Sequence, residues 1–283
     1  MVTTMQTHFG PPDTVENLVR EGAQALRSGR VAQAQDLARA LLAQHPQNPD
    51  ALALFGMTLL AQNKASEAIE PLRDAARVRP GAIVETHLGQ ALRRSGRIAE
   101  ALTVLQQASE RQPPVPDAFF ELGTLLHEKR RFAEAEAVLR RGLAVAPAGQ
   151  LSFVLGTILL ERGDFEDASV SFAQALATSP GHPSVLCGLG RARMARGELD
   201  RALENFRQAM ANNPSEGRAR FLTAQCLFEL GRPAEAMDCL RALVTWAPQS
   251  FGGALKTCVE AGKGRFWLKR SAAAKALGFN QAR

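Results

Sequence analysis

Residues 49–80 read PDALALFGMTLLAQNKASEAIEPLRDAARVRP. Apolar side chains recur at three- and four-residue steps through the first half, which is the spacing of one face of an α-helix. The second half carries a similar stripe that includes Ala68 and Leu72. Asn63 stands between the halves, where a left-handed residue can end a helix, and Pro80 lacks the amide donor that a continuing helix needs. The stretch therefore predicts a helix, a turn and a second helix.

The same pattern returns along the chain at a nearly constant interval. With the closing proline of each unit numbered as position 32, successive prolines lie 33 or 34 residues apart. A fixed period of this length is typical of stacked repeats, because one helix pair cannot bury its apolar faces alone. The prolines are Pro46, Pro80, Pro113, Pro147, Pro180, Pro214 and Pro248. Position 20 is alanine in every unit, at Ala34, Ala68, Ala101, Ala135, Ala168, Ala202 and Ala236.

Two further positions are small for physical reasons. Position 8 is glycine in six units and Ala224 in the seventh, which lets two helices approach closely. Position 15 is mostly glycine or asparagine, the residues that most easily end a helix in the left-handed conformation. The first unit departs from the pattern, because it has Ala38 at position 24 and Leu41 at position 27, where the other units place a large residue first.

This pattern closely resembles the tetratricopeptide repeat family, in the form of a bacterial-type scaffold. The family signature has small residues at positions 8 and 27, alanine at 20, a large residue at 24 and proline at 32. The resemblance covers residues 15–250 and implies an all-α fold, a right-handed α-solenoid or superhelix of about seven helix–turn–helix units. The predicted units are residues 15–48, 49–81, 82–115, 116–148, 149–182, 183–216 and 217–250.

The two ends lie outside the repeats. Residues 1–14 are predicted to be a flexible lead, and residues 251–283 a basic helical cap or degenerate eighth unit. Two short helices are expected in this tail, at about residues 250–261 and 265–277. The tail accounts for the whole net charge of +6, so residues 1–250 together are neutral. Its basic residues include Lys263, Arg265, Lys269, Arg270 and Lys275.

The chain offers no constellation that predicts chemistry. Its five histidines have no nucleophile or second acid at a constant spacing, and no phosphate-binding glycine loop is present. We therefore predict no enzyme activity, no cofactor and no metal site. The four cysteines form no CxxC motif and are expected to be reduced thiols. With no long apolar run and no secretory signal in the sequence, we expect a cytoplasmic protein.

The resemblance implies that the first helix of each unit lines a concave groove, with positions 2, 5, 9 and 12 facing it. Positions 5, 9 and 12 form one helical stripe beside the core stripe. The phenylalanines in this stripe have an alternative role as ordinary core. The groove candidates are Met57, Leu60, Gln90, Arg93, Phe120, Thr124, His127, Phe153, Thr157, Leu160, Arg191, Met194, Phe221, Gln225 and Phe228.

These residues predict the chemistry of a partner. Arg93 and Arg191 read as isolated positive charges that could meet an acidic side chain. Positions 5 and 9 contain no lysine and no asparagine, so the family's clamp for chaperone carboxyl termini is absent. We therefore predict a scaffold or adaptor that binds an extended or helical internal segment of another protein, partly apolar with one or two acidic residues.

Several alternatives stay open at this point. The basic carboxyl-terminal helix could anchor a membrane-peripheral or targeting adaptor, and the array could recruit substrates for an enzyme complex. Self-association through the amino-terminal face or the groove is a further alternative. Nucleic acid is disfavoured, because no nucleic-acid-binding module accompanies the basic charge.

Overall fold

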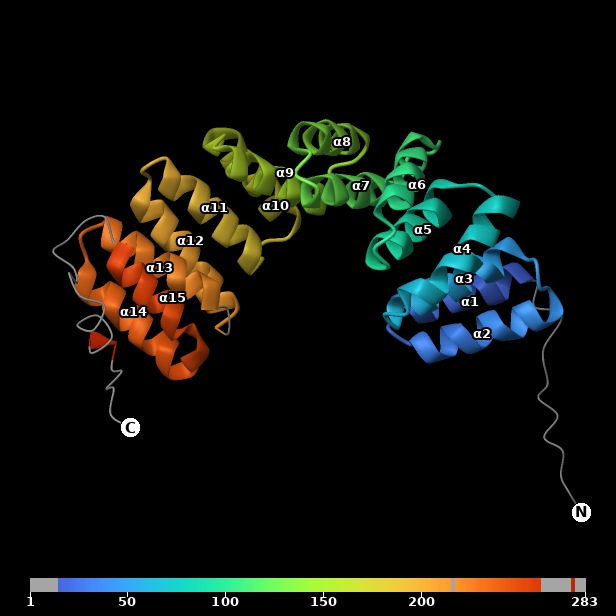
Figure 1. Cartoon of the computed structure of the whole chain (residues 1–283), viewed down its shortest axis with the longest axis horizontal. Helices are drawn as coiled ribbons and strands as arrows, with labels where there is room; N and C mark the ends of the chain where they lie inside the picture. The colour runs from blue at the N-terminus through green and yellow to red at the C-terminus, as the bar shows by residue number, and fades with distance from the viewer. Residues whose placement is uncertain (1–14, 215–216, 261–275, 278–283) are drawn as a thin grey trace, which may run out of the picture. The chain divides into compact units, whose positions relative to one another are not determined.

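The computed structural model describes residues 15–214, 217–260 and 276–277, and within them every regular element is a helix (Figure 1). The predicted all-α fold is thereby confirmed, with two helices to each stretch of 33 or 34 residues. The first helices of the pairs are α1 (Val15–Arg27), α3 (Pro49–Ala61), α5 (Ala82–Arg94), α7 (Pro116–Glu128), α9 (Gly149–Arg162), α11 (Pro183–Ala195) and α13 (Gly217–Glu229). The second helices are α2 (Val31–Gln44), α4 (Ala65–Val78), α6 (Ile98–Glu110), α8 (Phe132–Val145), α10 (Phe165–Thr178), α12 (Leu199–Asn212) and α14 (Pro233–Trp246), followed by the 3-10 helix η1 (Pro248–Ser250) and α15 (Phe251–Glu260).

The turn inside each pair is fixed by one left-handed residue. Position 15 has a positive φ in all seven pairs, including Asn63 at 61° and Gly163 at 89°. Arg130 occupies this position in the fourth pair with a φ of 58°, a conformation that costs energy for a residue with a side chain. Its guanidinium lies 5.1 Å from the ring centroid of Phe132, and this cation–π contact offsets part of that cost.

The two helices of a pair meet where a small residue faces a large one. A Cβ atom added to Gly190 would lie 2.4 Å from Cε1 of Phe206, and one added to Gly89 would lie 2.4 Å from Leu105. The position-20 alanines are 0% exposed in every pair, so a larger side chain has no room there. The small residues of the repeat signature therefore lie where the two helices of a pair are in close contact.

In the first pair, where position 24 is small and position 27 is large, a residue of the next pair packs against Gly22. Ala38 leaves position 24 small, and a Cβ atom on Gly22 would instead lie 2.4 Å from Cδ2 of Leu54 on α3. Ala38 and Leu41 are both buried. Leu54 thus fills the space that the large position-24 residue fills elsewhere.

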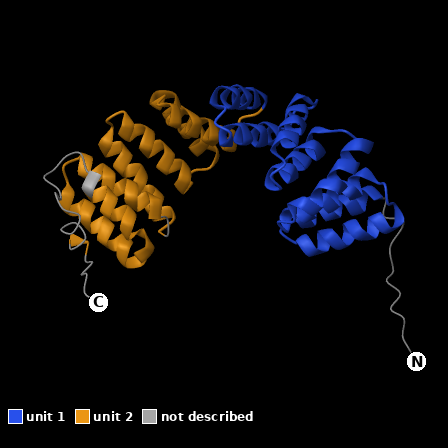
Figure 2. Cartoon of the chain, viewed as in Figure 1, with its two compact units in different colours: residues 1–145 blue, residues 146–283 orange. Residues whose placement is uncertain are grey.

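The chain divides into two compact units, residues 1–145 and 146–283 (Figure 2). Within each unit every helix contacts the next one along the chain, and each first helix also contacts the following first helix. First helices therefore form one layer of the stack, and second helices form the other. Among the described residues, no helix has the length and apolar content needed to cross a bilayer.

The tail is described in part. Helix α15 packs on α13 and α14. Its bounds, residues 251–260, lie close to those of the first predicted tail helix, at about residues 250–261. Arg241 Nε donates a hydrogen bond to the Ala276 carbonyl at 2.9 Å, and Leu277 is 4% exposed in the core of residues 146–283. The predicted lead of residues 1–14, the second tail helix up to residue 275 and the basic tail residues lie outside the described residues.

Candidate protein-interaction surface

We call the residues at positions 2, 5, 9 and 12 of the first helices the first-helix surface, and consider it separately in each unit. Three predicted groove candidates are buried, since Leu60 is 4% exposed, Leu160 is 8% exposed and Phe228 is 1% exposed. Their interpretation as accessible groove residues is wrong. Position 12 borders the core stripe, and burying a large apolar side chain there is favourable because it removes apolar surface from water.

The other candidates are half-buried or exposed. The Phe153 ring centroid lies 6.0 Å from that of Phe172, and a Cβ atom on Gly253 of α15 would lie 2.8 Å from Cζ of Phe221. Both rings are therefore engaged with the protein interior on one side. Half-buried are Met57, Gln90, Arg93, Phe120, Thr124, His127, Phe153, Thr157, Arg191, Met194 and Phe221, whereas Gln225 is exposed.

Arg93 is not the isolated charge that the sequence suggested. Its Nη2 lies 3.0 Å from Oε2 of Glu121, and its Nη1 lies 2.8 Å from Oε1 of Glu128. Gln90 also donates to Glu121 at 3.1 Å. The Glu121 side chain is 8% exposed, so Arg93 neutralises a buried carboxylate and holds α5 against α7. The acids belong to the following pair, outside the stripe that the prediction considered.

Arg191 on α11 differs from Arg93. Within the described part of the chain it has no ion pair or hydrogen bond, and the same holds for Arg218 in the first turn of α13. Burial lowers the pKa of Arg191, and the positive charge of Arg218 lowers it further, while the more weakly acting carboxylate of Glu161 opposes both effects. Arg218 occupies position 2, which the candidate list left out.

Residues 1–145 contain a cavity of about 450 Å³ between the amino-terminal ends of α3 and α5. Leu72 and Ala75 of α4 and the turn before α7 complete its walls. Met57, a predicted candidate, lines it, and so does Ile83, whose side chain is 60% exposed. Ile83, like Arg218, occupies position 2. Position 2 was among the positions implied to face the groove, but the predicted groove candidates included no residue from it.

The cavity also has a polar edge. Arg79 Nη1 lies 2.7 Å from Oδ1 of Asp50, and His87 Nδ1 lies 2.7 Å from the carbonyl oxygen of Ile83, to which the Nδ1–H tautomer donates. All of these residues line the cavity. The site can therefore accept an apolar side chain and align a polar backbone beside it.

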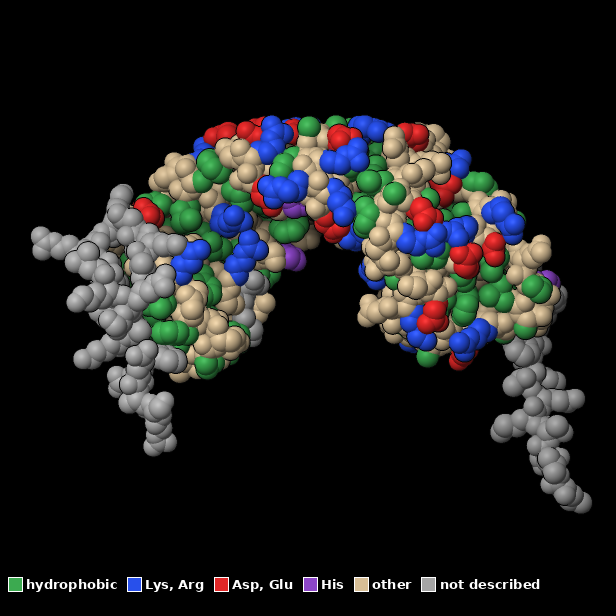
Figure 3. Space-filling view, in the orientation of Figure 1, with side chains coloured by type: hydrophobic (Ala, Val, Ile, Leu, Met, Phe, Trp, Pro, Cys, Tyr) green, Lys and Arg blue, Asp and Glu red, His purple; other side chains and the backbone are tan. Residues whose placement is uncertain are grey.

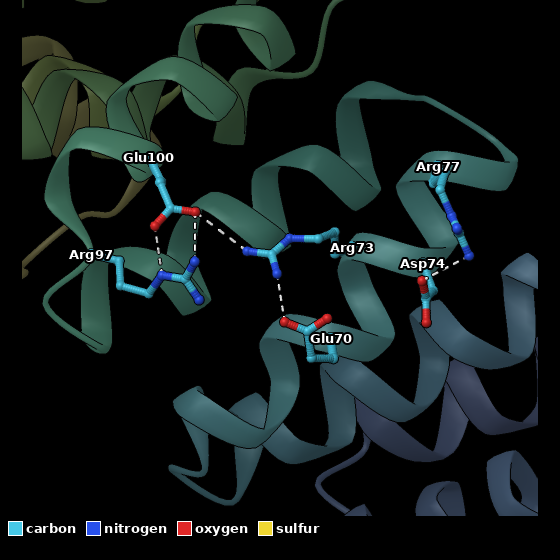
Figure 4. A network of polar contacts seen from close by, with 6 residues as sticks. All are labelled: Glu70, Arg73, Asp74, Arg77, Arg97 and Glu100. Carbon is cyan, nitrogen blue, oxygen red and sulfur yellow. Dashed lines mark hydrogen bonds and ion pairs between the residues drawn. The ribbon is translucent and has the colours of Figure 1, made fainter.

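The second helices of residues 1–145 present a different surface. Arg97 binds both carboxylate oxygens of Glu100 at 2.7 Å, and Arg73 pairs with Glu100 and Glu70 (Figure 4). The hydrogen bond from Arg97 lowers the pKa of Glu100. In Figure 3, acidic and basic side chains lie next to one another over these helices. This surface neutralises its own charge.

The described residues include no group of three His, Cys, Asp or Glu side chains that could hold a metal ion. All four cysteines are free thiols. Burial raises the pKa of Cys226 and of Cys258 to about 11, so both thiols are protonated at neutral pH and are weak nucleophiles.

Fold and surface together define the chain as a stacked helical repeat array. Two family models, both described as tetratricopeptide repeat, match it over residues 87–149 and 187–251 and over residues 25–85 and 159–204. The chain therefore belongs to the tetratricopeptide repeat family, as the sequence pattern indicated. Arrays of this kind serve in general as scaffolds for protein–protein interaction.

Solved structures with the same fold share little sequence with the chain. A chain of the APC/C hetero-tetramer Cut9–Hcn1 is 19% identical with a TM-score of 0.67, and the match covers 76% of this chain and 43% of that one. This chain thus spans less than half of that relative. Pseudomonas aeruginosa pilF is 19% identical with a TM-score of 0.67 over 75% of this chain and 97% of its own. YrrB, described as a TPR protein with an unusual peptide-binding site, is 20% identical with a TM-score of 0.51 over 64% of this chain and 95% of its own. No curated protein sequence matches the chain.

Proposed function

We propose that this protein is a non-catalytic scaffold that binds a segment of another protein on its first-helix surface. The observation that carries the proposal is the open apolar cavity between α3 and α5, which the exposed Ile83 and the half-buried Met57 both line. Exposed apolar residues that line a cavity are typical of a site for a partner's side chain. YrrB, with a peptide-binding site named in its description, gives a precedent within the same fold.

The charge distribution supports the first-helix surface over the second helices. Most acidic and basic side chains on and beside α4 and α6 are already paired with one another, so a partner would have to replace existing ion pairs to bind there. The cavity holds one ion pair, between Asp50 and Arg79, at its edge. A partly apolar segment gains more by burying itself in the cavity.

The described end of the tail favours its role as a cap over a membrane anchor. Leu277 is buried among core side chains that include Leu240, and Arg241 holds the preceding carbonyl. A terminal cap is what a repeat stack requires to cover its last apolar face. We also infer a reducing compartment such as the cytoplasm, since Cys187, Cys226 and Cys258 are buried free thiols.

A peptide selection tests the proposal. A phage library of random ten-residue peptides is panned on the immobilised full chain, and the selected peptides are measured by fluorescence anisotropy. Ile83→Asp, which places a charge on the exposed rim of the cavity, is expected to weaken the peptides that use it by about tenfold. The control is Val170→Asp on α10, since Val170 is 51% exposed on a second helix.

Circular dichroism of both variants checks that the fold is intact. The proposal fails if no peptide is selected, or if every selected peptide binds the two variants and the parent chain equally well.

A further inference from the structure

Two arginines on the first-helix surface of residues 146–283 make no ion pair with the described residues, and the carboxylate of Glu161 acts on Arg191 more weakly than the charge of Arg218 does. Arg191 lies on α11 and Arg218 on α13, and the two helices pack against each other. The positive charge of Arg218 acts on Arg191, and neither guanidinium has an ion pair or hydrogen bond within the described residues. Like charges brought close together cost folding free energy.

The lack of pairing is unusual for this unit. Most other arginines there reach an oxygen acceptor: Arg196 contacts Glu166 and Glu198, and Arg193 donates to the amide oxygen of Asn205 at 2.8 Å. Figure 3 shows Lys and Arg side chains on this unit lying among hydrophobic and uncharged ones. The other arginines that reach an oxygen acceptor are Arg162, Arg201, Arg220, Arg232 and Arg241.

Arg191 is also partly withdrawn from water. It is half-buried, and burial is the largest cause of its lowered pKa, ahead of the charge of Arg218. A partner carboxylate would offset both costs, because it carries the opposite charge and accepts two parallel hydrogen bonds that an arginine guanidinium donates.

We propose that Arg191 and Arg218 bind an acidic side chain of the partner polypeptide. This inference rests on the proposed scaffold function and assigns part of the partner's chemistry. Met194 lies one turn after Arg191, and Phe221 lies one turn after Arg218, both half-buried. The preferred segment therefore carries Asp or Glu followed or preceded by apolar residues. It is a polypeptide rather than a nucleic acid, because a nucleic acid needs many phosphate contacts and residues 1–250 carry 27 basic and 27 acidic residues.

The test uses the same ten-residue phage library, panned on the full chain and on the double variant Arg191→Gln/Arg218→Gln. Peptides selected on the parent chain are expected to be enriched in Asp and Glu, and the enrichment is expected to disappear on the variant. Individual acidic peptides should bind the variant about tenfold more weakly, and their affinity for the parent chain should fall as salt is added.

The matched control is Arg201→Gln/Arg207→Gln, which removes two charges from α12, the second helix of the same unit. It should leave peptide affinity unchanged. Replacing Asp or Glu of a selected peptide by Asn or Gln should cause the same loss as the double variant, and combining both changes should add little.

The outcomes separate the two proposals. Selected peptides without acidic enrichment, equally bound by the arginine variant but weakened by Ile83→Asp, would overturn the arginine site and leave the scaffold function standing. If neither first-helix change matters, the scaffold function fails as well. A ten-nucleotide single-stranded RNA that binds in an Arg191- and Arg218-dependent manner, when acidic peptides do not, would overturn the site as a polypeptide site.

Discussion

Phe206→Ala is expected to lower the free energy of unfolding by about 3–5 kcal/mol. The side chain is 0% exposed and fills the space that Gly190 leaves between α11 and α12. Removal of the ring leaves a cavity that a packed helix pair can close only in part. Urea denaturation followed by circular dichroism measures the change, and Val170→Ala, at a site 51% exposed on α10, is the control. A loss below about 1 kcal/mol would contradict the packing described.

The pairing of Gly190 with Phe206 can be tested more sharply with a double-mutant cycle. The seventh pair already combines Ala224 with Leu240 at these two positions. Gly190→Ala alone should destabilise by about 1–3 kcal/mol, because its Cβ would meet the Phe206 ring. In the presence of Phe206→Leu, the penalty should shrink by about 1 kcal/mol. Strictly additive effects would mean that the two residues do not share the space.

Arg93→Met is expected to destabilise the protein by about 2–3 kcal/mol, since it leaves the buried carboxylate of Glu121 without its charged partner. Arg191→Met, at an arginine with no such partner, should instead raise the melting temperature by about 2 °C. Thermal unfolding at neutral pH measures both. Arg97→Met, which breaks an exposed pair with Glu100, should change the melting temperature little.

The sign for Arg191 follows from its lowered pKa. A base whose pKa is lower in the folded than in the unfolded state destabilises the fold wherever it is charged, that is, at every pH below the folded value. Because an arginine side chain stays charged at neutral pH, the charge of Arg191 destabilises the fold there. The opposite signs at Arg93 and Arg191 distinguish a structural arginine from one kept for binding. Equal destabilisation by both changes would contradict this distinction.

The sequence predicted the repeat because its determinants are local. A left-handed residue at position 15, an alanine at position 20 and a glycine opposite a large side chain each act within one helix pair. The structure therefore has the same period as the sequence, and Arg130 is left-handed like the other position-15 residues. The size swap of the first pair could not be interpreted in this way, because Leu54, the residue that resolves it, belongs to the next pair.

The candidate surface was harder to predict, for the same physical reason. Arg93 at position 12 and Arg191 at position 9 both read as isolated positive charges in the sequence. The sequence did not show that the next first helix supplies a carboxylate, Glu121, to Arg93. The burial of Phe228 also depends on neighbouring pairs. Ile83 was within reach of prediction, since position 2 was already implied to face the groove.

The central claim is that the first helices, and not the second helices, bind a partner polypeptide. A photo-cross-linking amino acid placed at Ile83 on α5, Gln225 on α13 or Val170 on α10 tests it directly, because all three positions are exposed. With peptides selected on the full chain, cross-links are expected from Ile83 and Gln225 and not from Val170. Cross-links from Val170 alone, or equally from all three positions, would contradict the account.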